Sequence, residues 1–285
     1  MNRREIGSIT AKGGFVNEIE ICKKFNNWLK DEEAKLWLEI MGYNVNKITS
    51  VDAVQIPTTI NIKKLAEYEL KEDDFEELIK FKKADAQIKI RIKIGNILKI
   101  ENISLKKANS DANYNQIDKR SVDEYKKMWN FCDEIAFWLK LFTGENKPEL
   151  FNNKIRKIKL KDKRRIFFNE MPKNIQEKII NFFENNRLLI VNDILKGRGG
   201  LSANWILITR FNKKENTTTW ILKDINTAIN FFGSGEIKIS PRGSLYIGRI
   251  TLQRKGGTPD PTKLQFKINP CELFNIGGEE NIGNK

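Results

Sequence analysis

The chain has 285 residues, of which 40 % are hydrophobic, and carries a formal net charge of +14. That length can bury one sizeable core, and no apolar run approaches the ~18 residues that a membrane-spanning helix needs. Histidine is absent, which excludes Ser-His-Asp and Cys-His catalysis, histidine-ligated zinc and any nuclease chemistry built on a histidine base.

The basic charge favours a polyanionic partner, and nucleic acid is the commonest one. The alternative is a solvated basic surface without a ligand. A membrane-surface role is disfavoured because the basic residues are spread along the chain and not gathered on one amphipathic helix. Cys22, Cys132 and Cys271 stand far apart, and their odd number argues against a disulfide framework and for a reducing compartment. We therefore expect a cytoplasmic protein.

The first third of the chain alternates between helical and extended patterns. Residues 15–41 carry apolar side chains at helical spacing. Residues 51–58 are expected to form a short strand or loop, and the charged segment 64–81 is helix-like. In 86–94, "AQIKIRIKI", apolar residues alternate with polar ones, as in a half-buried strand. Gly95-Asn96 is a suitable tight turn, and 97–106 then returns as the second strand of a hairpin.

The remainder of the chain is expected to be richer in strands. Residues 110–115 are expected to form a loop, 121–142 a long amphipathic helix, and 154–165 a basic connector to a helix near 173–185. Strands are expected over 205–211, 217–224, 243–255 and 263–268, separated by Gly/Pro punctuation. These patterns predict one α/β domain over 1–285 with a β-rich C-terminal portion and a disordered tail over 277–285.

The end of the predicted hairpin, "NISLKK" (102–107), carries the first candidate site. Residues two apart share a face of a strand, so Ser104 and Lys106 point the same way, while Leu105 points into the opposite layer. A turn at Gly95-Asn96 pairs residues whose numbers sum to about 191. Asp85 should then lie across the hairpin from Lys106. If Leu105 lies in the core, then Lys106, on the other side of the strand, is expected on an open face of the sheet.

A carboxylate, a hydroxyl and a lysine can serve metal-assisted phosphodiester hydrolysis. Mg²⁺ prefers oxygen ligands, which Asp85 and Ser104 offer. A bound metal ion lowers the pKa of a water ligand and neutralises charge that develops on the phosphorus. Lys106 could orient that water or stabilise the transition state. The spacing by itself favours a plainer interpretation, namely a strand-starting aspartate and a solvated lysine.

Longer segments carry a family likeness. The chain resembles the PD-(D/E)xK type II restriction endonucleases, most closely the HinP-type group that cleaves GCGC. The resembling segments, which keep the same order over most of the chain, are "IGSITAKGGFVNE" (6–18), "YNQIDKRSVDEYKKMW" (114–129), "KDKRRIFF" (161–168), "LKGRG" (195–199), "GSGEIKISPRGSLYIGRITLQRKGG" (233–257) and "LQFKI" (264–268). The resemblance implies a mixed central β-sheet flanked by helices, with a catalytic portion over 1–145 and a helical and β-rich DNA-recognition portion over 146–276.

The resemblance also implies catalytic roles. It assigns the catalytic aspartate to Asp85 and the lysine to Lys106, with Mg²⁺ as the cofactor held by Asp85 and Ser104. Ser104 stands where the group usually has glutamine, and Ala84 where it usually has serine. Glu18 is our candidate for a further acid that completes the metal shell, and its alternative is an ordinary surface glutamate. Residues 58–81 look like an insertion relative to the group.

The resemblance places several polar segments at DNA. "YNQIDKR" supplies a base-reading set at the expected start of a helix, and "TLQRKGG" supplies a second set. Arginine and lysine suit guanine, glutamine and asparagine suit adenine, and an acid can accept from cytosine. Arg254 is the candidate for bidentate guanine reading. The expected DNA-binding residues are Tyr114, Asn115, Gln116, Asp118, Lys119, Arg242, Gln253, Arg254, Lys255 and Lys267; the alternative for each basic one is a phosphate contact or plain solvation.

The resulting expectation is a Mg²⁺-dependent type II restriction endonuclease that makes double-strand cuts at a short GC-containing palindrome, GCGC or a related site, and leaves 5′-phosphate ends. The partner is double-stranded DNA, with a cognate DNA methyltransferase as a functional partner, and the oligomeric state is open, a homodimer included. The alternative is a DNA- or RNA-binding protein that keeps the nuclease fold with weakened catalysis, which the identities of Ser104 and Ala84 suggest.

Overall fold

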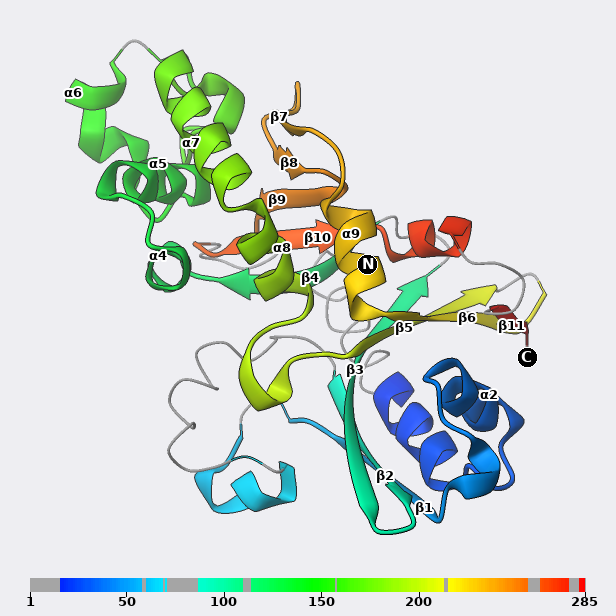
Figure 1. Ribbon diagram of the computed structural model, residues 1–285. Coiled ribbons are helices and arrows are strands. Elements are labelled where there is room, and N and C mark those ends of the chain that lie inside the picture. Colours follow the sequence, from blue (N-terminus) through cyan, green and yellow to red (C-terminus); the bar gives the residue numbers. More distant parts are fainter. Residues whose placement is uncertain are drawn as a thin grey trace.

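The computed structural model describes residues 16–57, 60–68, 70, 87–109, 114–156, 158–212, 215–255, 262–276 and 282–284. Within these residues the strands form two sheets, which lie one above the other in Figure 1. Helices flank both sheets, so the expected α/β class with a mixed central sheet is confirmed.

The first sheet contains six of the described strands in the order β1-β2-β3-β5-β6-β11. Only β3 and β5 pair in parallel among these neighbours; the other pairs are antiparallel. The sheet is therefore mixed. The strands are β1 (Ser50–Gln55), β2 (Gln87–Ile94), β3 (Ile97–Asn109), β5 (Trp205–Asn212), β6 (Thr217–Asp224) and β11 (Ile282–Asn284).

The hairpin of β2 and β3 has the predicted register. Gly95 takes a positive φ of 56° at the turn, and Gln87 lies opposite Ser104 at the far end of the described ladder. The alternation of apolar and polar residues places Ile103 and Leu105 in a core shared with β2 and the N-terminal helices. Ser104 and Lys106 therefore project from the other face of the sheet.

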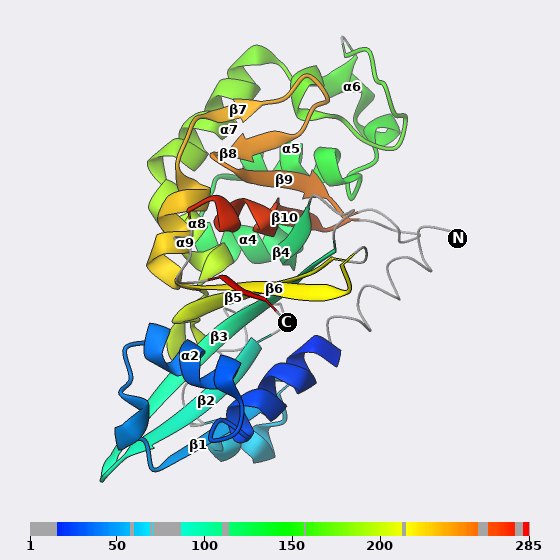
Figure 2. The ribbon, with the colours of Figure 1, turned by 90° about the vertical axis from the view of Figure 1, so that its right-hand side faces the viewer.

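Two helices cover the face of the first sheet that carries Leu105 (Figures 1 and 2). The first spans 16–26, and the second is α2 (Glu32–Ile40), whose N-cap Asp31 accepts a bond from the Ala34 amide. The helical pattern over 15–41 thus belongs to two helices. The break coincides with Asp31 because an aspartate satisfies the free amides at a helix start.

A short segment covers part of the opposite face. η2 (Ile62–Tyr68) is a 3-10 helix where the sequence predicted an α-helix over 64–81; residues 71–81 of that prediction lie outside the described residues. Leu65, Tyr68 and Leu70 pack with Leu201 in a small apolar cluster. The segment therefore joins the edge of the first sheet to the loop that precedes β5.

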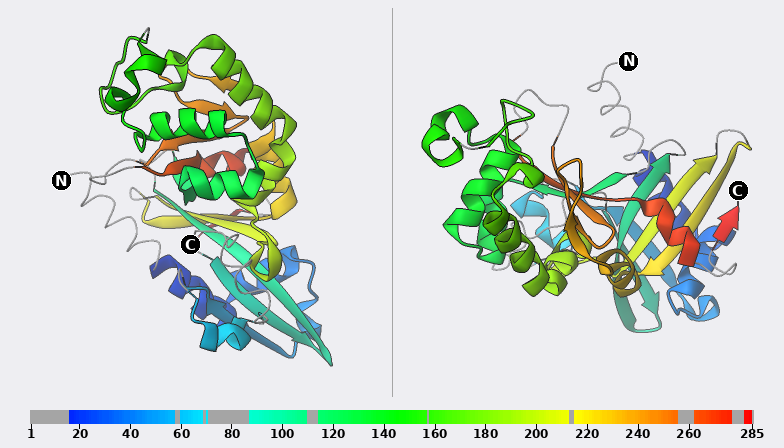
Figure 3. Two further views of the ribbon diagram at one scale, coloured as in Figure 1. Left: turned by 90° about the vertical axis from the view of Figure 1, so that its left-hand side faces the viewer. Right: turned by 90° about the horizontal axis from the view of Figure 1, so that it is seen from above.

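The second sheet has five of the described strands in the order β4-β10-β9-β8-β7 (Figures 1 and 3), and every neighbouring pair is antiparallel. Its helix-facing side packs in the largest apolar cluster, which extends to the Lys106 face of the first sheet through Ile206 and Ile208. The strands are β4 (Asn115–Arg120), β7 (Ile237–Ile239), β8 (Leu245–Ile247), β9 (Ile250–Arg254) and β10 (Leu264–Ile268).

The helices of this half pack around the same cluster. They are α4 (Val122–Trp129), α5 (Asp133–Thr143), α6 (Asn152–Ile155), α7 (Lys173–Asn185), α8 (Arg187–Leu195) and α9 (Ile225–Gly233). The remaining 3-10 turns are η1 (Val45–Lys47), η3 (Pro148–Phe151), η4 (Phe168–Glu170), η5 (Gly199–Leu201) and η6 (Pro270–Ile276).

Several boundaries differ from the expectations. The helix predicted over 121–142 is broken between α4 and α5, where Asn130 ends α4 in the left-handed conformation with φ 51°. Asparagine tolerates that conformation better than most residues. Residues 282–284, which were expected in a disordered tail, pair with β6 as β11. Helices α8 and α9 were not predicted.

The division into a catalytic portion over 1–145 and a recognition portion over 146–276 does not coincide with the two sheets. β4 lies in the first portion yet belongs to the second sheet, whereas β5 and β6 lie in the second portion yet complete the first sheet. The chain thus crosses between the sheets more than once.

Candidate active site and nucleic-acid interface

The end of β3 brings Ser104 and Lys106 into the space between the two sheets. Ser104 is fully buried, and Lys106 is only 5 % exposed. The open-face position expected for Lys106 is therefore wrong, because the second sheet packs against that face. Lys106 Nζ donates a hydrogen bond to the main-chain oxygen of Gln116, on β4, at 3.2 Å. Leu105 is buried on the other face, as predicted.

The same face of the first sheet carries further buried polar groups. Asn102, two residues before Ser104, donates from Nδ2 to the carbonyl oxygens of Gly200 and Ser202 at 3.1 and 3.0 Å. Lys89 lies opposite Asn102 and donates to the carbonyl oxygen of Tyr68. Neither role was predicted, because the acceptors lie in η2 and around η5, 21 and about 100 positions away in the chain.

Asp85 and Ala84 lie outside the described residues, so the structure does not place the predicted catalytic carboxylate. The described ladder ends with the pair Gln87 and Ser104. Continuing this register by two residues on each strand would set Asp85 against Lys106. The juxtaposition of these two residues stays a prediction.

Glu18 occupies the 16–26 helix and is 8 % exposed. Gln55, at the end of β1, donates to its carboxylate. Burial first, and then the negative charges of Glu18 and Asp52, raise the pKa of the Cys22 thiol to about 12. Because this helix covers the Leu105 face, Glu18 and Lys106 approach from opposite faces of the sheet.

The oxygen donors in this region fit a hard divalent cation in type. Glu18 offers a carboxylate and Ser104 a hydroxyl, and Mg²⁺ prefers such oxygens. Among the described residues, no group of three or more histidine, cysteine, aspartate or glutamate side chains is arranged to hold a metal ion. A metal site here would therefore need Asp85 as an additional ligand.

The second sheet presents a polar face on the side away from its helices. We define this polar face by one side of β4, β10 and β9; it comprises Gln116, Lys119, Gln253, Lys255, Gln265 and Lys267. Gln265 lies opposite both Lys119 and Gln253, and Lys267 lies opposite Gln116. A register shift between Phe266 and Lys267 keeps Gln116 and Lys119 on one face. The structure thus brings together five of the residues expected at DNA.

The polar face is electrostatically suited to an anion. Burial, and then the charge of Lys119, lowers the pKa of Lys255. Burial, and then the charge of Lys255, lowers the pKa of Lys267. Lys255 is therefore repelled by both Lys119 and Lys267, and a phosphate backbone among these ammonium groups would relieve that repulsion.

The remaining expected DNA contacts lie elsewhere. Residues 115–120 form β4, so the prediction that they begin a helix is wrong; α4 begins at Val122. Asp118 faces the helices, is 1 % exposed, accepts a bond from the Tyr125 hydroxyl and pairs with Arg120 at 3.2 Å. Its negative charge is thus neutralised within the core, and it is not on the polar face.

Other members of the expected set lie off the polar face, in or near strands of the second sheet. Arg254 lies opposite the buried Leu264 and so faces the helices. Burial, and then the neighbouring charge of Arg164, lowers its pKa. Tyr114 is 43 % exposed just before β4, Asn115 donates to the Lys107 carbonyl oxygen at 3.0 Å, and Arg242 is exposed in the turn between β7 and β8.

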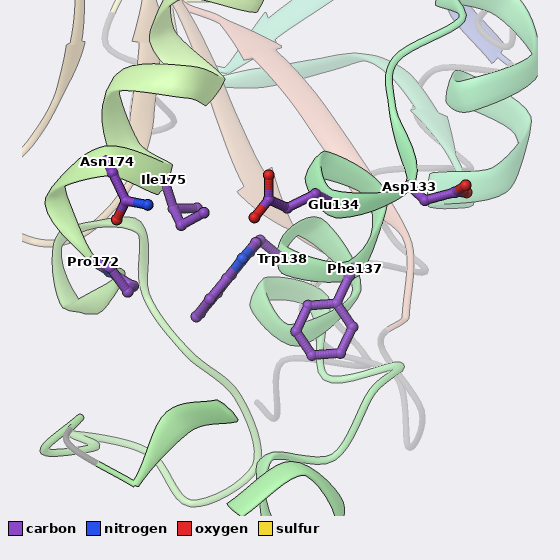
Figure 4. Close-up of a pocket in the computed structure, with 7 residues that line it drawn as sticks. All are labelled: Asp133, Glu134, Phe137, Trp138, Pro172, Asn174 and Ile175. Carbon is purple, nitrogen blue, oxygen red and sulfur yellow. The ribbon is translucent and has the colours of Figure 1, made fainter. Parts of the chain in front are cut away.

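A pocket of about 740 Å³ lies between α5 and α7, apart from these residues (Figure 4). Trp138 and Glu134 of α5 line it together with Asn174 and Ile175 of α7. Glu134 pairs with Lys178 at 2.5 Å across the two helices. The pocket is formed by helix packing, and it holds none of the expected catalytic or DNA-binding residues.

Two comparisons agree with this architecture. A model of the R.HinP1I restriction endonuclease family matches residues 76–274. The fold is similar to that in a crystal structure of restriction endonuclease MspI in complex with its cognate DNA, with a TM-score of 0.57, 12 % identity, and coverage of 94 % of this chain and 93 % of that one. A search of curated proteins found no match.

The fold and the family match together define a type II restriction endonuclease, a site-specific deoxyribonuclease that binds and cleaves DNA. The chain belongs to the R.HinP1I restriction endonuclease family, whose match covers more than half of its length. Within the described residues, no helix is both long and apolar enough to span a bilayer.

Proposed function

We propose that the protein cuts both strands of duplex DNA at a short GC-containing palindrome, GCGC or a related site, with Mg²⁺ as cofactor, and leaves 5′-phosphate ends. The observation that supports this proposal is the β2–β3 register, whose described part ends at Gln87 and Ser104. Continued by two residues on each strand, the same register would set Asp85 against Lys106. The GC preference rests on the likeness to the GCGC-cutting group.

Asp85 and Ser104 would hold the metal ion. Glu18 lies on the Leu105 face of the sheet, so it would have to approach the ion around the end of the strands to supply a further carboxylate. The ion would supply an acidified water and charge neutralisation at the phosphate. Lys106 would set its ammonium beside the scissile phosphate and stabilise the charge that develops there. Its burial favours this role because a charge is less screened in a water-poor site.

The polar face would lie against the DNA. Lys119, Lys255 and Lys267 would contact phosphates, while Gln116 and Gln253 would reach base edges. Tyr114 and Asn115, which precede Gln116 in the chain, and Arg242, in the turn between β7 and β8, would add further contacts to the DNA. Symmetric cutting of a palindrome suggests a homodimer on the DNA, and a cognate DNA methyltransferase would protect the same site in the host genome.

The test is incubation of plasmid DNA with the protein and Mg²⁺, alongside the same mixture with EDTA. Discrete fragments only in the Mg²⁺ tube are expected, and mapping their ends gives the recognition sequence and the end chemistry. Ligation of the fragments without prior phosphorylation would establish 5′-phosphates.

A nuclease-fold DNA- or RNA-binding protein with weakened catalysis is the second candidate function. Its supporting observation is the complete burial of Ser104, which stands at the position of a usual metal ligand. Retarded but intact nucleic acid in both tubes of the same experiment would favour this alternative.

A further inference from the structure

Gln265 is a buried amide on a face that is otherwise partly open. It is 4 % exposed, and its neighbours Lys119, Gln253 and Lys267 are all more accessible. A buried amide needs hydrogen-bond partners to offset its desolvation. Gln265 Nε2 donates to Gln116 Oε1 at 2.7 Å.

The bond between Gln265 and Gln116 lies beside an irregularity in the pairing of β4 and β10. Gln116 lies opposite Lys267, so Gln265 contacts it diagonally across β4 and β10, and the register of the two strands shifts between Phe266 and Lys267. At such an irregularity the ladder of main-chain bonds is interrupted, and the strand is less well held. The side-chain bond ties Gln116 to β10 across this interruption.

The other end of Gln116 touches the candidate catalytic lysine. Its main-chain oxygen accepts the bond from Lys106 Nζ at 3.2 Å. Gln116 belongs to the second sheet and Lys106 to the first. Two successive hydrogen bonds therefore join Gln265, on the polar face, to the ammonium group of Lys106.

The direction of the Gln265 bond also orients the Gln116 amide. Because Gln116 Oε1 accepts from Gln265, the group that Gln116 offers to a ligand is its Nε2 donor. A fixed donor suits an acceptor on a base edge or in the DNA backbone.

We propose that Gln265 is a positioning residue that holds Gln116 in place and, through it, the ammonium group of Lys106, so that the DNA-facing sheet and the cleavage centre keep one geometry. This inference rests on the proposed endonuclease function. The physical reason is that small displacements of a catalytic group cost large factors in rate.

The variant that tests this proposal is Gln265→Met, which keeps the length and volume of the side chain and removes the hydrogen bond. The measurement is the single-turnover cleavage rate at saturating DNA that carries the sequence cut by the wild type. We expect a rate roughly tenfold lower, which corresponds to the loss of one buried hydrogen bond. The dissociation constant, measured by gel retardation without metal, should change less than about threefold because the phosphate contacts remain.

Two further variants distinguish a loss of positioning from a general loss of protein stability. In Gln265→Glu the carboxylate can still accept a bond from the Gln116 amide after that amide turns over. Gln116 then offers Oε1 in place of Nε2 to the DNA but stays held to β10, so the rate at saturating DNA should recover to within about threefold of wild type. Gln176→Met removes a bond of the same length, which Gln176 on α7 donates to the carbonyl oxygen of Met171, just before that helix. It should cut at the wild-type rate, with a matched thermal midpoint showing that all variants are folded.

A double mutant shows whether Gln265 acts through Gln116. In a Gln116→Met background, Gln265→Met should cause no further loss of rate. Additive losses, a wild-type rate for Gln265→Met, or equal losses for Gln265→Met and Gln265→Glu would each overturn the proposal. A wild-type protein that cuts no DNA would instead refute the proposed function, so the two failures are distinguishable.

Discussion

Lys106, together with Lys89 and Arg120, differs from the other described basic residues in being buried. It is almost completely buried, and its ammonium group bonds the main chain of the neighbouring sheet. A buried ammonium costs desolvation energy, which the bond to the Gln116 carbonyl oxygen partly offsets. The sequence placed Lys106 on the correct strand face but could not show that the face is covered.

We predict that Asp85→Ala and Lys106→Ala each reduce cleavage below detection while DNA binding changes little. Removal of a metal ligand or of the charge-stabilising group affects the chemical step more than the phosphate contacts. Cleavage and gel retardation are measured on the same preparations. Lys107→Ala is the matched control, because Lys107 points to the other face of β3; near wild-type cutting by either active-site variant would refute the assignment.

Arg254 can be assigned by comparing two substitutions. Its position on the helix side, away from the polar face, disfavours the guanine reading expected from the sequence. We therefore expect Arg254→Lys to retain binding to cognate and random DNA, because the charge is kept. Poor discrimination by this variant with normal random-DNA binding would show that the planar guanidinium reads a base. Both affinities are measured at several salt concentrations.

At the scale of elements, two glycines in turns allow a controlled stability test. Gly95, between β2 and β3, and Gly248, between β8 and β9, share a φ of +56°. A Cβ on Gly95 would meet no atom within 4 Å, whereas one on Gly248 would lie 2.3 Å from the Ser234 carbonyl oxygen. The two positions thus share the same φ angle and differ in the room that is available for a Cβ atom.

We expect Gly95→Ala to lower the free energy of unfolding by about 1 kcal/mol, which is the usual cost of a left-handed conformation in an alanine. Gly248→Ala should cost at least about 2 kcal/mol more, because backbone atoms must move apart as well. Denaturant unfolding of both variants measures the difference. Equal losses would show that the turn at Gly248 has more room than its contacts indicate.

At the scale of the whole molecule, the basic residues behind the net charge of +14 are not all placed where they would contact DNA. The structure gathers Lys119, Lys255 and Lys267 on the polar face. Burial, and then the charge of a neighbouring lysine, lowers the pKa of the latter two. Many other lysines lie far from this face. Lys47, for example, is exposed in η1, at the other sheet.

We predict that each alanine substitution of these three lysines makes the plot of log binding constant against log salt shallower by about one. Lys47→Ala removes the same charge and should leave the slope unchanged. Fluorescence anisotropy over a range of salt concentrations measures both. Identical slopes for Lys47→Ala and Lys267→Ala would mean that DNA does not bind at the polar face.

Local patterns in the sequence determined the β2–β3 hairpin, its register and the opposite faces of Leu105 and Lys106. These features depend on neighbours in the chain, namely a glycine turn and a two-residue alternation. The resemblance to restriction endonucleases, which rests on long ordered segments, likewise pointed to the family that the chain belongs to.

Only the tertiary structure decided that Asn115–Arg120 is a strand and that Asp118 lies in the core. Both outcomes depend on partners that lie far along the chain, because β4 pairs with β10 and Gln116 bonds Gln265, 149 positions away. A short polar segment has no strong preference of its own, so the partner that it meets selects its conformation. For the same reason, the burial of Lys106 could not be predicted from the sequence, because it depends on the packing of the second sheet against β3.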